Sequence, residues 1–158
     1  MMADALRVVL VDDEELVRSG LRLLLSNAPD IEVVAEASNG RDAVATVLDA
    51  QPDVVLMDIR MPVMDGIAAV EKILSVHAVP IIMLTAFDTD SFILRALRAG
   101  AAGFLLKSTP PESLMAAVRA AAAGQPLLSP GVVDKLVSMQ GPALDDVHSH
   151  HTRTCLLY

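Results

Sequence analysis

The stretch Val54-Val55-Leu56-Met57-Asp58 decides the fold, because four apolar residues end there in an aspartate. Short apolar runs that alternate with segments of helical periodicity predict buried parallel strands. The ligand site of an open parallel sheet lies beyond the carboxyl ends of its strands. Three further apolar runs also end in polar residues. Val8–Val11 is followed by Asp12 and Asp13, Ile81–Leu84 by Thr85, and Phe104–Leu106 by Lys107. We therefore expect carboxylates, a hydroxyl and an ammonium to meet at one edge of a sheet.

Five strands and five helices are expected to alternate along the chain. The strands are predicted at residues 6–11, 31–37, 54–58, 79–84 and 102–106, and the helices at 14–28, 40–50, 67–74, 90–99 and from 110 to a stop at Gly124. Right-handed crossovers of this length predict an α/β fold, a doubly wound five-stranded parallel sheet in the order 2-1-3-4-5 with helices on both faces. Residues 1–126 form the predicted domain, and 127–158 a short helix at 129–139 and a tail.

Two helix starts have side chains suited to capping the first turn. Asp65 is the expected N-cap of the third helix. Thr109, Pro110 and Glu112 have the spacing of a capping box, with the hydroxyl at N-cap, proline at N1 and the carboxylate at N3.

Composition limits the classes of partner. The chain has 158 residues, 53% of them hydrophobic and 3% aromatic, which predicts an aliphatic core. The net charge is -8, and the arginines fall in isolated pairs that we interpret as solvated helix faces, Arg18 with Arg22 and Arg95 with Arg98. Clustered basic residues are needed to bind a phosphate backbone, so we expect no contact with nucleic acid.

Cysteine usage and hydropathy indicate the cytoplasm. Cys155 is the only cysteine, so no internal disulfide is possible and a reducing compartment is expected. Neither a membrane-spanning apolar stretch nor a signal peptide is recognised, and we expect no membrane association.

The adjacent carboxylates at positions 12 and 13 and the one at 58 would repel each other unless a cation neutralises them. All-oxygen ligation favours Mg²⁺ or Mn²⁺ over zinc, and the nearest histidine, His77, falls at a helix end. The alternative for Asp12 and Asp13 alone is a helix N-terminus decorated with acids, which the helix dipole favours.

Four stretches in order and spacing resemble the receiver domain of response regulators in two-component signalling systems, over about residues 5–126. They are Val9-Leu10-Val11-Asp12-Asp13-Glu14, Leu56-Met57-Asp58-Ile59-Arg60-Met61-Pro62-Val63-Met64-Asp65-Gly66, Leu84-Thr85-Ala86 and Gly103-Phe104-Leu105-Leu106-Lys107.

The resemblance implies a phosphoryl switch, which is not an enzyme beyond its own phosphorylation and dephosphorylation. Asp58 would accept the phosphoryl group from a sensor histidine kinase, and Asp13, Asp58 and the carbonyl of Arg60 would bind the metal ion. Asp12 would act through a metal-bound water. Lys107 would pair with the phosphoryl group, and the hydroxyl of Thr85 would sense it. Phe104 would be the rotamer switch. Arg60 and Phe87 are the two bulky residues expected to flank the entrance used by the attacking water.

Plain structural roles stay open for two of these residues. Phe104 also fits an ordinary strand aromatic, and Thr85 an ordinary hydroxyl at the end of a strand.

Residues 124–130 look most like the NarL/FixJ type, in which a helix-turn-helix domain that binds DNA follows the receiver. No segment after Pro130 is long enough for such a domain, so this chain alone is not expected to bind DNA. A homodimer on phosphorylation is expected, through the fourth helix, fifth strand and fifth helix or through the first and fifth helices. The small apolar contacts expected on the former surface are Ala96, Leu97, Ala117 and Ala121. His148, His150, His151 and Cys155 in the tail are not expected to bind metal.

Two other classes of function are alternatives to a receiver. A phosphohydrolase of the haloacid-dehalogenase type also uses an aspartyl nucleophile, but it needs two aspartates spaced one residue apart, whereas Asp58 is followed by Ile59 and Arg60. An interaction module that is never phosphorylated is the second alternative, and the complete set of three aspartates argues against it.

Overall fold

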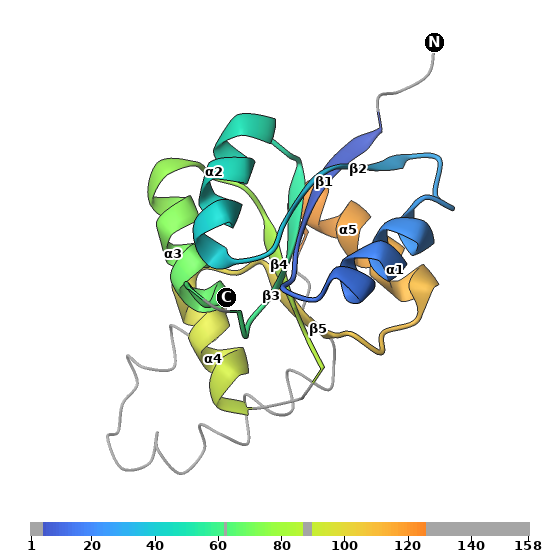
Figure 1. Cartoon of the computed structure of the whole chain (residues 1–158). Helices are drawn as coiled ribbons and strands as arrows, with labels where there is room; N and C mark the ends of the chain where they lie inside the picture. The colour runs from blue at the N-terminus through green and yellow to red at the C-terminus, as the bar shows by residue number, and fades with distance from the viewer. Residues whose placement is uncertain (1–4, 62, 87–89, 126–158) are drawn as a thin grey trace.

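The computed structural model describes residues 5–61, 63–86 and 90–125, without the side chains of 90–93. Strands and helices alternate along the chain (Figure 1). The strands are β1 (Leu6–Val11), β2 (Ile31–Ala37), β3 (Val54–Asp58), β4 (Ile81–Thr85) and β5 (Gly103–Leu106). The helices are α1 (Glu15–Leu25), α2 (Gly40–Ala50), α3 (Gly66–Val76), α4 (Asp90–Ala99) and α5 (Pro111–Ala122).

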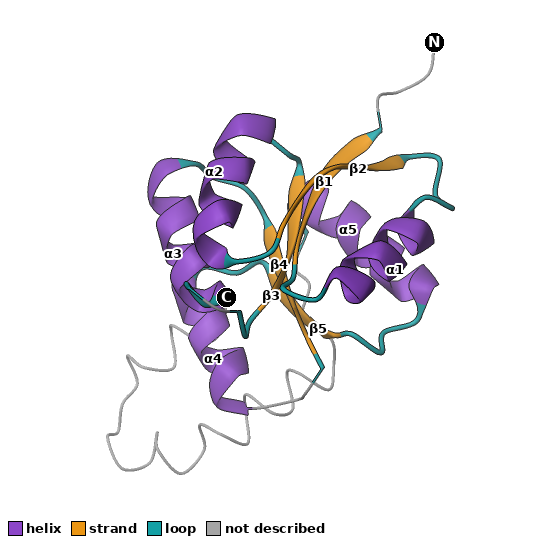
Figure 2. Cartoon of the chain, viewed as in Figure 1, coloured by secondary structure: helices purple, strands orange, loops and turns teal. Residues whose placement is uncertain are grey.

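The sheet has the predicted architecture. All neighbouring strands are parallel and follow the order β2-β1-β3-β4-β5. Helices α2, α3 and α4 cover one face, and α1 and α5 cover the other (Figure 2). The fold class and strand order are therefore confirmed.

Alternation along the strands produces two apolar layers. Val9 and Val11 of β1 pack in the layer beneath α2, α3 and α4, whereas Val8 and Leu10 pack in the layer with α1 and α5. Successive strand side chains point to opposite faces, so a strand covered on both sides needs a continuous apolar run. The described core is aliphatic apart from Phe104, as the composition predicts.

The bounds of α1 and α3 differ from expectation, and α3 spans Gly66–Val76 instead of 67–74. Helix α1 ends at Leu25 instead of residue 28, and the following turn donates from Ala28 N to the Leu25 carbonyl at 3.0 Å. Asp65 caps α3 as predicted, since its side chain accepts a bond from Ala68 N at 2.8 Å.

The capping box predicted for α5 is wrong. Pro110 is the N-cap, with an extended backbone (φ -57°, ψ 148°), Pro111 opens the helix, and no side chain caps it. A proline disfavours helical geometry in the residue before it, so Pro111 excludes Pro110 from the first turn.

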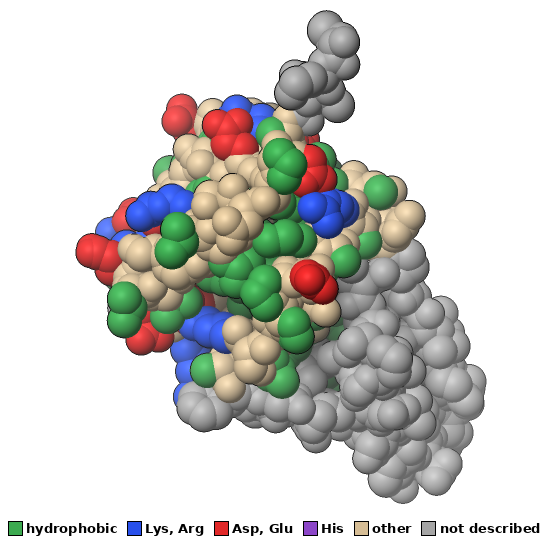
Figure 3. Space-filling model, turned by 90° about the vertical axis from the view of Figure 1, so that its right-hand side faces the viewer, with side chains coloured by type: hydrophobic (Ala, Val, Ile, Leu, Met, Phe, Trp, Pro, Cys, Tyr) green, Lys and Arg blue, Asp and Glu red, His purple; other side chains and the backbone are tan. Residues whose placement is uncertain are grey.

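The four small apolar residues expected on the outer surface of α4 and α5 are in the core instead. Ala96, Leu97, Ala117 and Ala121 are all buried, so the interpretation of their side chains as surface contacts is wrong. The large exposed apolar side chains of the described residues include Leu16 and Leu23 of α1, which covers the same face of the sheet as α5. Figure 3 shows hydrophobic side chains gathered in the middle of the face that α1 and α5 form.

Within the described ranges, none of the helices combines the length and apolar character needed to cross a bilayer. Phe87, the short helix at 129–139 and the tail residues lie outside the described residues.

We predict that Gly66→Ala destabilises the protein. A Cβ at this position would lie 2.1 Å from the backbone oxygen of Asp58 and 2.9 Å from Ile59 Cα. Overpacking of this kind costs about 1–3 kcal/mol of unfolding free energy, measurable by urea denaturation. The control is Gly20→Ala in α1, where nothing lies within 4 Å of the added carbon. Helix propensity predicts a gain of about 0.5–1 kcal/mol there. Equal effects of the two substitutions would contradict this packing.

Candidate functional site

Three buried polar side chains of the described chain occur at the same end of the sheet. Asp12 follows β1, Asp58 ends β3, and Thr85 ends β4, with exposed fractions of 2%, 7% and 6%. Lys107 directly follows β5 and is partly buried. Polar groups are costly to bury without partners, so their grouping indicates a built site rather than surface decoration.

The carboxylates of Asp12, Asp13 and Asp58 form one cluster. One oxygen from each lies within 4.8 Å of the others. Lys107 Nζ is 2.6 Å from Asp12 Oδ2 and 3.5 Å from Asp58 Oδ1. The sequence-based expectation that these four side chains meet therefore holds in the structure.

The electrostatics of the cluster disfavour ionisation of Asp58. Burial, and then the charge of Asp12, raise the pKa of Asp58 to about 6, although Lys107 opposes the shift. Burial alone would lower the pKa of Lys107, but its hydrogen bond to Asp12 and the charges of Asp58 and Asp12 raise it overall. Lys107 therefore remains an ammonium near neutral pH.

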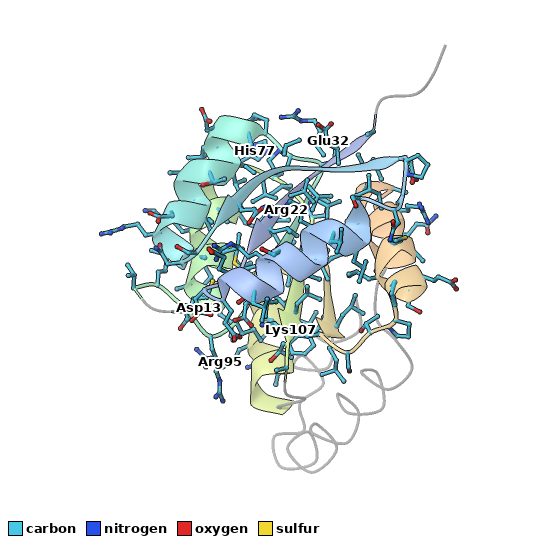
Figure 4. The ribbon with its side chains drawn as sticks, turned by 45° about the vertical axis from the view of Figure 1, so that its right-hand side comes forward. Asp13, Arg22, Glu32, His77, Arg95 and Lys107 are labelled. Atoms are coloured by element: carbon cyan, nitrogen blue, oxygen red, sulfur yellow. The ribbon has the colours of Figure 1, made fainter. Side chains whose placement is uncertain are left out.

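Chemically, the cluster fits a hard divalent cation. Its three members offer carboxylate oxygens, and neither histidine nor cysteine joins them among the described residues. Figure 4 shows Asp13 and Lys107 at one end of the sheet and Glu32 and His77 at the other. Oxygen donors with one exposed carboxylate, Asp13, suit Mg²⁺ or Mn²⁺ and leave room for retained waters.

The loop after Asp58 is fixed by close backbone contacts. Gly66 N donates to the Ile59 carbonyl at 2.7 Å, and Gly40 N donates to the Met64 carbonyl at 3.0 Å. A Cβ on Gly40 would lie 2.3 Å from that Met64 oxygen. Val63 has a φ of 71°, a strained value for a β-branched residue, and such strain tends to occur at functional sites.

Thr85 and Phe104 project from the same face of the sheet. Met83 is paired with Phe104, and Thr85 lies two residues beyond Met83 on the same strand. Phe104 is 2% exposed and packs in the layer beneath α2, α3 and α4. The Thr85 carbonyl also accepts a bond from Lys107 N at 2.7 Å, which joins the ends of β4 and β5. Arg60, by contrast, is exposed.

Sequence reasoning missed Arg18. The interpretation of Arg18 as part of a solvated helix face is wrong, because its side chain is 15% exposed. Its guanidinium donates to the backbone oxygen of Asp12 at 2.5 Å and to Glu36 Oε1 at 3.1 Å. The sequence gives no signal for this contact, because Arg18 and Arg22 have the same helical spacing whether they face water or a strand.

We predict that Asp58→Asn stabilises the metal-free protein at neutral pH. The pKa of Asp58 is raised on folding from 3.8 to about 6, so the folded state binds the proton more tightly than the unfolded state. Stability therefore falls as pH rises from about 4 to 6, by on the order of 2 kcal/mol. Urea denaturation in EDTA should show the variant more stable than the wild type at pH 7.5, with little difference at pH 4.

The control is Asp49→Asn, an exposed position on α2, which should change stability little at either pH. A difference between Asp58→Asn and the wild type that does not vary with pH would refute the electrostatic account.

Known proteins are similar to this chain in sequence and in fold. The sequence model of the response regulator receiver domain family matches residues 8–119 of this chain. The transcriptional regulatory protein YxjL of Bacillus subtilis, itself described as uncharacterized, is 41% identical over 94% of this chain and 69% of its own length. LiaR of B. subtilis is 39% identical over 94% of this chain and 71% of its own length.

A crystal structure of a LuxR-family two-component response regulator from Aurantimonas sp. SI85-9A1 has the same fold. It superposes with a TM-score of 0.80 at 34% identity, covering 87% of this chain and 99% of the other. The chain belongs to the response regulator receiver domain family.

Proposed function

We propose that this chain is a phosphorylation-activated switch that accepts a phosphoryl group on Asp58 from a sensor histidine kinase. The grouping of Asp58 with Asp12, Asp13 and Lys107 is the observation that carries the proposal. Family membership supports it, because response regulators are the signalling partners of such kinases in two-component systems.

In the proposed reaction, an oxygen of the Asp58 carboxylate attacks the phosphorus of a phosphohistidine or of a small donor such as acetyl phosphate. An O–P bond forms at Asp58 while the bond from phosphorus to the donor breaks, and the donor keeps the electron pair. The reaction depends mainly on in-line positioning and charge neutralisation. Lys107, 3.5 Å from Asp58 Oδ1, is suited to pair with the incoming phosphoryl oxygens.

The other proposed roles are those that the resemblance to receiver domains implies. Asp13, Asp58 and the carbonyl of Arg60 would hold Mg²⁺ or Mn²⁺, and Asp12 would act through water. A bound divalent ion neutralises charge on the transferred group.

Thr85 and Phe104 would carry the signal away from the site. The Thr85 hydroxyl would donate to a phosphoryl oxygen, and Phe104 would fill the space that Thr85 leaves. Their shared face of the sheet supports this pairing. Phe104 lacks a hydroxyl, so its contribution would be packing alone.

The output that we propose is control of transcription in the cytoplasm. YxjL and LiaR are named as transcriptional regulatory proteins, which supports an output through a DNA-binding domain. We assign residues 1–126 to the receiver and 127–158 to a short helix and linker. Phosphorylation would promote a homodimer through α4, β5 and α5, or through α1 and α5.

The site does not favour the phosphohydrolase alternative. That class needs a second aspartate two residues after the nucleophile, where this chain has Arg60. A labelling experiment distinguishes the proposed switch from an interaction module that is never phosphorylated.

We predict that Asp58→Asn abolishes labelling by acetyl phosphate in Mg²⁺, because the nucleophilic oxygen is lost. The measurement is intact mass, with the wild type gaining one phosphoryl group that survives acid and is released by base. EDTA should stop labelling of the wild type, and the labelled protein should sediment as a dimer. Asp49→Asn keeps the same charge change away from the site and should label normally. Full labelling of Asp58→Asn would overturn the assignment.

A further inference from the structure

The partly buried Arg18 of α1 makes contacts that the proposed reaction does not use. Arg18 binds the Asp12 backbone oxygen and one oxygen of Glu36, and Arg22 binds the other oxygen of Glu36. The side chain of Arg22 is 53% exposed, whereas that of Arg18 is 15% exposed. The two arginines share Glu36 as a partner, and Arg18 also donates to the loop between β1 and α1.

That loop begins where the strand pairing stops. The ladder between β1 and β3 ends at Val11 paired with Met57, so the Asp12 carbonyl lies one residue beyond it. A buried carbonyl needs a donor, and the Arg18 guanidinium supplies it at 2.5 Å. The contact replaces a strand partner at the point where the chain turns toward Asp13.

Asp12 is held at all of its polar atoms. Its amide donates to the Ala37 carbonyl at 3.1 Å, and Oδ1 accepts from Glu14 N at 2.9 Å. Oδ2 accepts from Lys107 at 2.6 Å, and the carbonyl accepts from Arg18. The carbonyl bond is the one that restrains the peptide joining Asp12 to Asp13, because that carbonyl belongs to this peptide.

We propose that Arg18 is a positioning residue that orients the peptide between Asp12 and Asp13, and so the Asp13 carboxylate, for divalent cation binding. Glu36 of β2 holds the guanidinium in place. A guanidinium has several donors in a rigid plane and can bind the carbonyl and the carboxylate together, which a lysine ammonium cannot match in geometry. The inference rests on the proposed function, since it concerns the cation that the same site would bind.

The orienting role of Arg18 can be distinguished from an effect of its charge on cation affinity. Loss of a cationic side chain that contacts Asp12, a member of the acidic cluster, should strengthen the attraction of the cluster for a divalent ion. Loss of orientation should weaken binding instead, and changes to groups that orient metal ligands typically cost 10–100-fold in affinity. The two explanations therefore predict opposite signs for Arg18→Met.

The test is Mn²⁺ binding to the full metal-free chain, followed by electron paramagnetic resonance of the free ion. Arg18→Met should weaken binding about tenfold or more. Arg18→Lys, which keeps the charge, should weaken it less. Arg22→Met removes the other partner of Glu36 and should bind as the wild type does. Circular dichroism of each variant verifies the fold, and the lysine variant decides the matter if the methionine variant is unfolded.

The Mg²⁺ dependence of acetyl phosphate labelling gives a second readout. In Arg18→Met more Mg²⁺ should be needed for half-maximal labelling, and saturating Mg²⁺ should restore the rate. Wild-type affinity in both Arg18 variants, or equal weakening in Arg22→Met, would overturn the role of Arg18. Absence of Mn²⁺ binding by the wild type would overturn the proposed function itself.

Discussion

The ammonium of Lys107 makes it possible to bury Asp12 and Asp58 beside each other. It lies 2.6 Å from one carboxylate and 3.5 Å from the other, while both carboxylates are almost fully removed from water. Asp13 adds a third negative charge within the same cluster, so one ammonium is not enough to balance it. Burial, and then the charge of Asp12, raise the pKa of Asp58, and the remaining negative charge suits the site to a divalent cation.

The sheet determines the geometry on which this balance depends. Residues far apart in sequence meet because β1, β3, β4 and β5 lie next to one another with their carboxyl ends at one edge. Apolar side chains bury both faces of these strands, and a one-residue slip would send every side chain to the opposite face. The core therefore fixes the register, and short backbone contacts at Gly40 and Gly66 fix the loop after Asp58.

Much of the site could be predicted because its polar residues lie at the ends of apolar strands. Asp58 and Thr85 end β3 and β4, and Asp12 and Lys107 directly follow β1 and β5. Arg18 could not, because an arginine pair four residues apart on a helix has the same pattern whether it faces water or a neighbouring strand. Its partner Glu36 lies on β2, and only the packing of α1 against that strand brings them together. The start of α5 differs from the prediction because two successive prolines compete for the first helical position. The burial of Ala96 and Ala117 could not be predicted, because alanine does not reveal which helix face is buried.

The central claim is that Asp12, Asp13, Asp58 and Lys107 form one cation-dependent pocket. Paramagnetic broadening of backbone amide NMR signals by substoichiometric Mn²⁺ tests it most directly, because the broadening reports distance from the bound ion. The account predicts that the amides of Asp13, Ile59 and Arg60 broaden first, and that Glu32 and His77 at the far end of the sheet stay sharp (Figure 4). Broadening centred away from the carboxyl ends of β1 and β3, or none at all, would contradict it.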